Sequence, residues 1–372
     1  MPKKRCKYGV EFRMFLYFCK MNRQVSPRTI IVAIDSLKGC LTSRQANAAA
    51  ARGFVAGNTN GRTVGVTVSD GGEGWLDAWE DACGGQRHAL TVHDALGRGV
   101  RAEWLQVQGR AIVESAQAVG LSLLNKEERD PLRASSLGVA EIVADALRMG
   151  CRDVVVGLGG TATSDAGRGM MPLIPALQAV GARFTIATDV ENPLYGPQGA
   201  ACVFGPQKGA TPAMVQRLDD EARALADENA RRMGRDLSHE PGAGAGGGLG
   251  YAFLQLLGAE RRSGAEMLLE AIGFDQMLCQ ADLVVTGEGH ADRQTLMGKL
   301  PSVILRHAQK AGVPTLLLAG RVSDSEALLN AGFADVRCIH PYDLPLSEAM
   351  RPEVTLRNIR QTCSAYLQSI IP

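Results

Sequence analysis

Short apolar runs that end in an acidic residue recur along the chain. Runs of this length, bounded by glycine and polar residues, predict buried β-strands. Further strands are predicted at 111–114, 153–158, 315–319 and 336–339. The runs that end in acids are residues 29–34 before Asp35, 63–68 before Asp70, the stretch FTIAT before Asp189, and 283–286 before Glu288.

Helical patterns lie between these strands. The sequence Thr42-Ser-Arg-Gln45 has the form of a capping box, and Gly57 is suited to end the helix that it opens. Thr211-Pro212 predicts a second helix start, with Gly234 after its end. Other helices are expected at 301–311, 324–330 and 354–370, in the last hundred residues, and around 139–147 and after the glycine tract 242–250.

Strands that alternate with helices are typical of a parallel sheet covered on both faces, so we predict an α/β fold. The 372 residues suffice for two domains. Residues 1–28 are set apart as a leader, expected to be disordered, because their apolar run at 14–19 is too short to span a bilayer.

Composition excludes several functions. The net charge is +1, from 40 basic and 39 acidic residues, which gives no overall field to attract nucleic acid or an anionic membrane. The nine cysteines are scattered without a C-x-x-C pair, as expected for reduced thiols in a cytoplasmic protein. No P-loop motif and no H-E-x-x-H motif is present. The sequence leaves the oligomeric state open, with a homodimer as one alternative.

The acids at strand ends predict a binding site. In open α/β sheets, ligands bind outside the carboxyl ends of the strands, so Asp35, Asp70, Asp189 and Glu288 are expected to line one crevice. A single acid after a strand would be an ordinary loop residue. Four of them, each beside glycine or lysine, favour a site.

Two glycine-rich tracts and three lysines add groups that could bind phosphate. GLGGTATSD follows a predicted strand, and PGAGAGGGLG precedes a helix whose amides could face an anion. The second tract contains G-x-G-x-x-G, but no strand precedes it, which disfavours a dinucleotide fold. Lys38, Lys208 and Lys299 lie in turns with glycine or proline. Taken singly, each tract could be a close-packed turn and each lysine a solvated surface residue.

Electrostatics links these groups. Two like charges 4 Å apart repel by about 4 kcal/mol at an effective dielectric near 20. Carboxylates beside a polyphosphate therefore need a cation between them, and Mg²⁺ held by one or two carboxylates and phosphate oxygens is the usual one. Acids, lysines and glycine loops together predict metal-assisted phosphoryl transfer.

The same segments resemble the bacterial glycerate kinase family that lacks a P-loop. The resemblance extends from residue 29 to about residue 367. It rests on IDSLKGCLTS, VSDGGEG, VVVGLGGTATSDAGRGM, ATDVENPLYGPQGAACVFGPQKGATPAMV, PGAGAGGGLG and DLVVTGEGHADRQTLMGKLP.

This resemblance implies a fold and an activity. A flavodoxin-like domain would be built from residues 29–68 and 275–372, with residues 69–274 as an inserted α/β domain and the active site between them. The implied reaction uses ATP and Mg²⁺ to phosphorylate D-glycerate, with 2-phosphoglycerate favoured over the 3-phosphate as product.

Roles are assigned to residues on this basis. Asp189 is the leading candidate to deprotonate the substrate hydroxyl and Asp292 the second, although Asp292 could instead cap a helix. Lys38 is placed with them as a catalytic contact to phosphate or carboxylate. Asp70, Glu73 and Glu288 are the expected Mg²⁺ ligands. The expected substrate or phosphate contacts are Asp35, Ser36, Gly160, Thr161, Ser164, Asp165, Lys208, Gly244, Gly246, Gly247, Gly248 and Lys299.

Three departures from the family pattern keep alternatives open. The segment after Met171 is several dozen residues shorter than in the family, His290 stands where arginine is usual, and Arg321 stands where a small residue is usual. The alternatives are a degenerate homologue that binds ligand without turnover, and a kinase of another small hydroxy acid.

Overall fold

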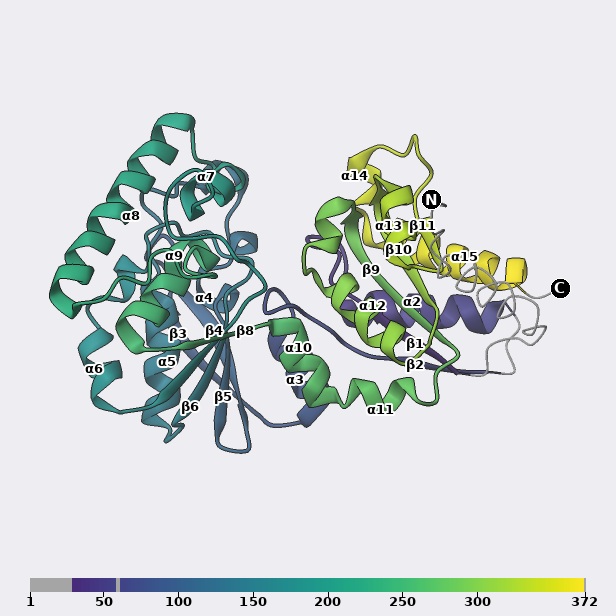
Figure 1. Cartoon of the computed structure of the whole chain (residues 1–372), viewed down its shortest axis with the longest axis horizontal. Coiled ribbons are helices and arrows are strands. Elements are labelled where there is room, and N and C mark those ends of the chain that lie inside the picture. The colour runs from purple at the N-terminus through teal and green to yellow at the C-terminus, as the bar shows by residue number, and fades with distance from the viewer. Residues whose placement is uncertain (1–28, 58–60, 371–372) are drawn as a thin grey trace, which may run out of the picture.

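The computed structural model describes residues 29–57 and 61–370, so the predicted leader at 1–28 lies outside the described residues. The chain forms two sheets, each with its own layer of helices (Figure 1). Within the described ranges, no helix is both long enough and apolar enough to cross a bilayer.

The first sheet combines strands from both ends of the chain. Its order is β11-β10-β9-β1-β2, and every neighbouring pair is parallel. Numbered along the chain this is 2-1-3-4-5, the order of flavodoxin-like sheets. The strands are β1 (Thr29–Ile34), β2 (Arg62–Gly65), β9 (Leu283–Ala291), β10 (Thr315–Val322) and β11 (Asp335–Cys338).

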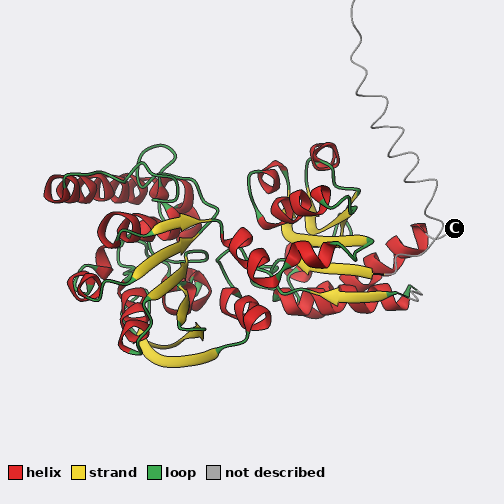
Figure 2. Cartoon of the chain, turned by 60° about the horizontal axis from the view of Figure 1, so that its bottom comes forward, coloured by secondary structure: helices red, strands yellow, loops and turns green. Residues whose placement is uncertain are grey.

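Helices cover both faces of this sheet (Figure 2). The predicted capping box is confirmed, because Thr42 Oγ1 accepts from Gln45 N at 3.2 Å and Gln45 Oε1 accepts from Thr42 N at 3.0 Å. A Cβ on Gly53 would lie 2.4 Å from the carbonyl oxygen of Arg360, so glycine there lets two helices meet closely. The helices are α2 (Ser43–Ala56), α12 (Leu300–Lys310), α13 (Ser325–Ala331), α14 (Leu346–Ala349) and α15 (Pro352–Ile370).

The second sheet has the sequential order β3-β4-β5-β6-β7-β8. An antiparallel hairpin forms one edge, and the strands from β5 to β8 are parallel. The sequence patterns did not predict the hairpin. The strands are β3 (Gln86–His93), β4 (Gly99–Val107), β5 (Arg110–Glu114), β6 (Asp153–Gly157), β7 (Arg183–Ala187) and β8 (Glu260–Arg262).

The helices around the second sheet include the predicted one after Thr211, whose hydroxyl accepts from Met214 N at 3.4 Å. That helix ends at Gly234, which adopts a left-handed φ of +69°. The helices are α4 (Ala116–Val119), α5 (Leu137–Arg148), α6 (Ile174–Ala179), α7 (Ala200–Phe204), α8 (Pro212–Met233) and α9 (Ala245–Tyr251).

Three helices lie where the two sheets approach each other: α3 (Trp75–Cys83), α10 (Gly264–Ile272) and α11 (Phe274–Leu278) (Figure 1). One buried apolar cluster contains Ile31 from the first sheet, Val155 from the second, and Leu268 from α10. This shared cluster gives the two sheets a common apolar contact. The division at residues 69 and 275 stays a prediction.

Two predicted strand boundaries need correction. The strand expected at 63–68 ends at Gly65, although Val66 N still donates to Val32 O at 2.8 Å. The strand expected at 283–286 continues to Ala291, because β10 continues beside it and Arg321 pairs with His290.

Candidate active site

The acidic residues that follow the strands gather where the carboxyl ends of the two sheets face each other. Asp35 follows β1, and its amide donates to Gly287 O of β9 at 3.0 Å, which places it beside Glu288. Burial raises the pKa of Asp35 well above its ordinary value. The nearby carboxylate of Asp70 raises it further, while Lys38 opposes both effects.

Asp70 links the two sheets. Its loop packs on the ends of β6 and β7, where Gly159 N donates to Gly71 O at 3.0 Å. Gly71 has a φ of +102°, and a Cβ there would lie 2.6 Å from the carbonyl oxygen of Ala187. A Cβ on Gly264 would similarly lie 2.2 Å from Asp70 O. Glycines at these positions thus hold Asp70 against the second sheet while its charge acts on Asp35 of the first.

Asp189 follows β7 and contacts the start of α10. Its Oδ2 accepts from Ala265 N at 3.4 Å. Burial raises the pKa of Asp189 to about 6, with a smaller upward contribution from Asp70, while hydrogen bonds from Ser263 and Ala265 oppose the rise. The carboxyl is therefore mostly ionised at pH 7, yet basic enough to accept a proton from a substrate.

Lys38 lies in the field of four acids. Its pKa is raised, first by Asp70 and further by Asp35, Glu73 and Glu288, while burial acts in the opposite direction. The structure therefore brings Lys38 and these four predicted acids together. Asp189 lies near the same group, because the charge of Asp70 also raises its pKa. Ser36, also predicted, is buried, and its amide donates to Asp35 Oδ1 at 2.7 Å.

Lys208 is the most constrained cation of the site. It ends the 3₁₀ turn Pro206–Lys208 and is only 3% exposed. Its Nζ donates to Thr163 O at 2.5 Å and approaches Thr161 Oγ1 at 3.5 Å. Burial lowers the pKa of Lys208 to about 8, opposed only by the charge of Asp165. In the part of the chain that the structure describes, Nζ forms no ion pair, so a buried positive charge faces this loop without a counterion.

The loop after β6 contains Gly160, Thr161 and Ser164, which the sequence predicted to line a phosphate site, and Lys208 contacts it at Thr161 and Thr163. Gly160 has a φ of +73°, and Leu121 N donates to its carbonyl at 2.8 Å. Ser164 is 6% exposed, and its hydroxyl has no hydrogen-bond partner among the residues that the structure describes. Ser164 directly follows Thr163, whose carbonyl accepts from Lys208, so an anion is the candidate group to complete the bonding of this loop.

Asp165 was predicted to contact phosphate, but its carboxylate accepts hydrogen bonds from the protein itself. Its Oδ2 accepts from Ser136 N at 2.9 Å, Ser136 Oγ at 2.8 Å and Gly169 N at 2.9 Å. Its Oδ1 accepts from Gly167 N at 3.1 Å. A carboxylate bound by four donors fixes the loop rather than a ligand, so Asp165 is not carried into the proposed site.

The second glycine tract packs against the same loop. Gly246, Gly247 and Gly248 all have left-handed φ values, so the amino end of α9 is not a regular helix. A Cβ on Gly247 would lie 1.8 Å from the carbonyl oxygen of Thr163. Gly247 O also accepts from Ala166 N at 3.0 Å. Close backbone packing thus explains why these residues and Gly244 are glycines, and the helix-amide phosphate site expected here is not formed as a helix N-terminus.

Glu288, Lys299 and Asp292 form a second small network. Glu288 accepts from Thr295 Oγ1 at 2.6 Å and from Lys299 Nζ at 3.0 Å. Asp292 accepts from Gln294 N at 2.8 Å and caps the 3₁₀ turn Arg293–Leu296. The structure therefore gives Asp292 the capping role that the sequence left as its alternative, and Lys299 neutralises Glu288.

Two further polar residues at this edge were not predicted. Glu114 ends β5, is 3% exposed, and accepts from Leu76 N at 3.2 Å. Burial raises its pKa to about 7. An apolar strand that ends in an acid is the same signal that identified the other acids. Ser263 holds Asp189 and caps α10, and no sequence pattern distinguishes it from an ordinary helix cap.

The acids of this edge do not form a ready-made cation site. Across the described residues, no three His, Cys, Asp or Glu side chains are arranged to hold a metal. Glu73 is exposed and Glu288 is already paired, so the predicted trio is not preassembled. Mg²⁺ usually needs only one or two carboxylates when phosphate oxygens complete its shell. Asp70, whose charge acts on both Asp35 and Asp189, is the candidate for such a carboxylate at this edge.

The chain was compared with known proteins. The model of the Glycerate kinase family matches residues 30–185 and 173–370, two segments that overlap at 173–185. The glycerate kinase of Halalkalibacterium halodurans is 36% identical over 359 residues, covering 87% of this chain and 93% of that protein. The glycerate 2-kinase of Escherichia coli K12 is 34% identical over 81% of this chain and 87% of its own length.

The fold has a counterpart of known structure. A crystal structure described as a candidate glycerate kinase 2 from Salmonella typhimurium LT2 superposes with a TM-score of 0.73 at 30% identity. The match covers 92% of this chain and 97% of that one.

Proposed function

Since the chain belongs to the glycerate kinase family, we propose that it transfers the γ-phosphoryl group of ATP to a hydroxyl of D-glycerate. The observation that carries this proposal is the buried, unpaired Lys208 at the same sheet edge as Asp189. A buried cation without a counterion is costly unless a bound anion neutralises it. Phosphate and carboxylate are the anions that this reaction supplies.

The residues act in a defined order. Asp189 accepts the hydroxyl proton, the freed oxygen attacks the γ-phosphorus, and the bond to the bridging oxygen breaks to release ADP. Lys208 and the hydroxyls of Thr161 and Ser164 bind an anionic group, either phosphate or the glycerate carboxylate. Lys38 offsets the charge that Asp35 and Asp70 present to the phosphates. Catalysis of this kind depends mainly on positioning and electrostatic stabilisation.

Mg²⁺ is part of this proposal. When bound, it would neutralise phosphate charge, with Asp70 as its main protein ligand. We expect a chelator in excess over the metal to abolish ADP release and Mg²⁺ to restore it, because the four acids would otherwise repel the nucleotide. Full activity of a metal-free preparation would contradict the role given to Asp70.

The direct test is an assay of the purified chain with ATP, Mg²⁺ and D-glycerate. ADP should appear in a coupled assay, and Lys38→Ala should reduce its rate strongly. A panel of other small hydroxy acids in the same assay tests the alternative substrate. We propose 2-phosphoglycerate as the product, in line with the name of the Escherichia coli relative. Phosphorus NMR of the product distinguishes it from 3-phosphoglycerate.

A second candidate function is ligand binding without turnover. It is favoured by the segment after Met171, which by resemblance is several dozen residues shorter than in the family. Under this alternative, calorimetry would detect binding of ATP or glycerate, while the assay would release no ADP above the Lys38→Ala background. The two measurements together decide between the candidates.

A further inference from the structure

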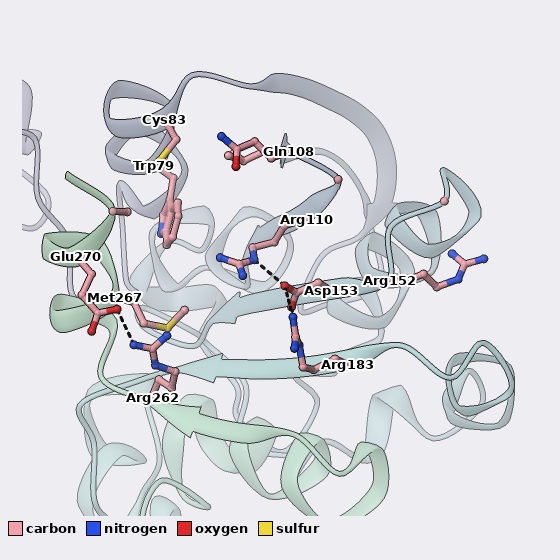
Figure 3. Close-up of a pocket in the computed structure, with 14 residues that line it drawn as sticks. Trp79, Cys83, Gln108, Arg110, Arg152, Asp153, Arg183, Arg262, Met267 and Glu270 are labelled. Carbon is pink, nitrogen blue, oxygen red and sulfur yellow. Dashed lines mark hydrogen bonds and ion pairs between the residues drawn. The ribbon is translucent and has the colours of Figure 1, made fainter. Parts of the chain in front are cut away.

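Helix α10 is held by ion pairs to both sheets. Near its carboxyl end, Glu270 pairs with Arg262 of β8 at 2.8 Å, which ties the helix to the second sheet (Figure 3). In its first turn, Glu266 pairs with His307 of α12 at 2.8 Å and with Arg306 of the same helix at 2.9 Å. Because α12 covers the first sheet, the start of α10 is held from the other side of the junction (Figure 1).

His307 lies between two carboxylates. Its Nε2 is 2.8 Å from Glu266 Oε2, and its Nδ1 is 2.6 Å from Asp275 Oδ1 of α11. A neutral imidazole carries one N–H, whereas the imidazolium donates from both nitrogens. Both hydrogen bonds are therefore made only by the charged ring. The side chain is 12% exposed, and the ring of Phe274 meets it edge-on.

The ionisation of His307 follows from these neighbours. Burial lowers its pKa, but the hydrogen bonds and charges of Asp275 and Glu266 raise it above the ordinary value. Among the described residues, these two carboxylates, from α11 and α10, are the charged groups that face the ring, and Arg306 of its own helix shares Glu266. The ring is therefore charged near pH 6, where Asp189 titrates.

The first turn of α10 also holds Asp189. Ala265 N donates to Asp189 Oδ2 at 3.4 Å. Glu266 N donates to Ser263 Oγ at 3.2 Å, which leaves the hydroxyl proton of Ser263 for its bond to Asp189. Both bonds favour the ionised carboxyl and so oppose the effect of burial on its pKa. Glu266 thus contacts Ser263 through its backbone and His307 through its carboxylate.

We propose that His307 is a positioning residue for Asp189: by holding the first turn of α10 from the first sheet, it keeps the two donors of that turn on the carboxylate. The inference rests on the proposed function, in which Asp189 is the general base. Without the imidazolium, α10 keeps its pair with Arg262 but loses a link to α12. The amide of Ala265 and the hydroxyl of Ser263 are then held less firmly, and Asp189 becomes harder to ionise.

The acid limb of kcat tests this role. His307→Gln should move the limb, expected near pH 6 in the wild type, to higher pH by about one unit, the size given by the loss of one hydrogen bond to a charged carboxylate. His93→Gln is the matched control. His93 also pairs with a glutamate, Glu141 at 2.7 Å, but lies on β3, at the opposite edge of the second sheet from β8. The control should keep the limb at its wild-type pH, and an unmoved limb in His307→Gln would overturn the proposal.

A second measurement needs no catalysis. A histidine whose pKa is raised by folding stabilises the folded chain below its ordinary pKa of about 6.5, and this stability is lost as the pH rises through the raised value. The wild type should therefore unfold at a higher temperature than His307→Gln at about pH 6, and the difference should close by about pH 9. A difference that is equal at both pH values would overturn the role of the charge.

The ionisation of Asp189 can also be followed without activity. The difference in stability between Asp189→Asn and its parent changes with pH as Asp189 ionises, so it reports the pKa of that carboxyl. If the wild type released no ADP, the proposed function would fail, and this measurement would still decide the inference. A pKa of Asp189 that is the same with and without His307→Gln would overturn it.

A second variant covers the case in which His307→Gln folds poorly. Glu266→Gln removes the same ion pair from the side of α10 and should move the acid limb in the same direction. In the double variant, the shift should be no larger than in Glu266→Gln alone, because both changes break one interaction. Shifts that add in the double variant would overturn the proposal.

Discussion

Replacement of Asp189 by asparagine is expected to reduce turnover by roughly 10²–10⁴-fold, the usual contribution of a general base. Asparagine keeps the shape of the side chain and can still accept the hydrogen bond from Ala265 N, which the carboxylate receives at 3.4 Å. It cannot accept the proton of the substrate hydroxyl. The effect should therefore appear in kcat, with a small change in the KM for ATP.

Stability serves as the control for this variant. Burial raises the pKa of Asp189 to about 6, so the ionised carboxyl is disfavoured in the folded state at neutral pH. The stabilising contribution of a group with a raised pKa is present at low pH and is lost as the pH rises through about 6. The Asp189→Asn variant has no carboxyl to ionise, so it does not lose this stability. Its unfolding temperature at pH 7 should be no lower than that of the wild type. Asp227→Asn, an exposed change on α8, should alter neither kcat nor the unfolding temperature.

The same pKa gives a pH dependence. In the wild type, kcat should rise as Asp189 loses its proton near pH 6, and this limb should be absent in the residual activity of Asp189→Asn. If asparagine instead abolished ATP binding with little effect on kcat, Asp189 would be reassigned as a metal ligand. A wild-type profile that is flat through pH 6 would also argue against a general base here.

Replacement of Lys208 by methionine should have the second large effect, a fall of roughly 10²–10³-fold in kcat/KM, comparable to the loss of one preorganised donor to a developing anion. Methionine keeps most of the volume of the side chain but loses the charge and the hydrogen bond to Thr163 O, which is 2.5 Å long. The buried site would then have no cation to bind phosphate or carboxylate. Steady-state kinetics with ATP and D-glycerate measures this loss.

The stability of the ligand-free protein should change in the opposite direction. Burial lowers the pKa of Lys208 to about 8, so its charged form is disfavoured in the folded chain at pH 7. Lys208→Met should therefore raise the unfolding temperature without ligand, while phosphate should stabilise the wild type but not this variant. The exposed Lys126→Met is the matched control and should leave both properties unchanged. If phosphate stabilised the wild type and Lys208→Met equally, the anion would bind away from Lys208.

The local elements of this chain were predictable because their signals are local. The capping box at Thr42, the helix after Thr211 and the apolar strands before Asp35, Asp189 and Glu288 each depend on a few neighbouring residues. The hairpin of β3 and β4 was missed, because β3 has a single buried residue, Val92, and its pairing depends on the sheet beside it. The acids could be assigned to one edge because parallel strands end on the same side.

What each glycine, acid and lysine does was decided by tertiary structure. The glycines of the second tract are needed because Gly247 meets the backbone of Thr163 from a segment more than eighty residues away, a contact that no local pattern encodes. Asp165 looks like a ligand in the sequence but is used by the amides of its own loop and by Ser136. The sequence by itself determined that acids, glycines and lysines would be present at strand ends. Only the folded chain determined that Lys208 is buried with no counterion among the described residues, because burial and desolvation depend on packing between distant segments.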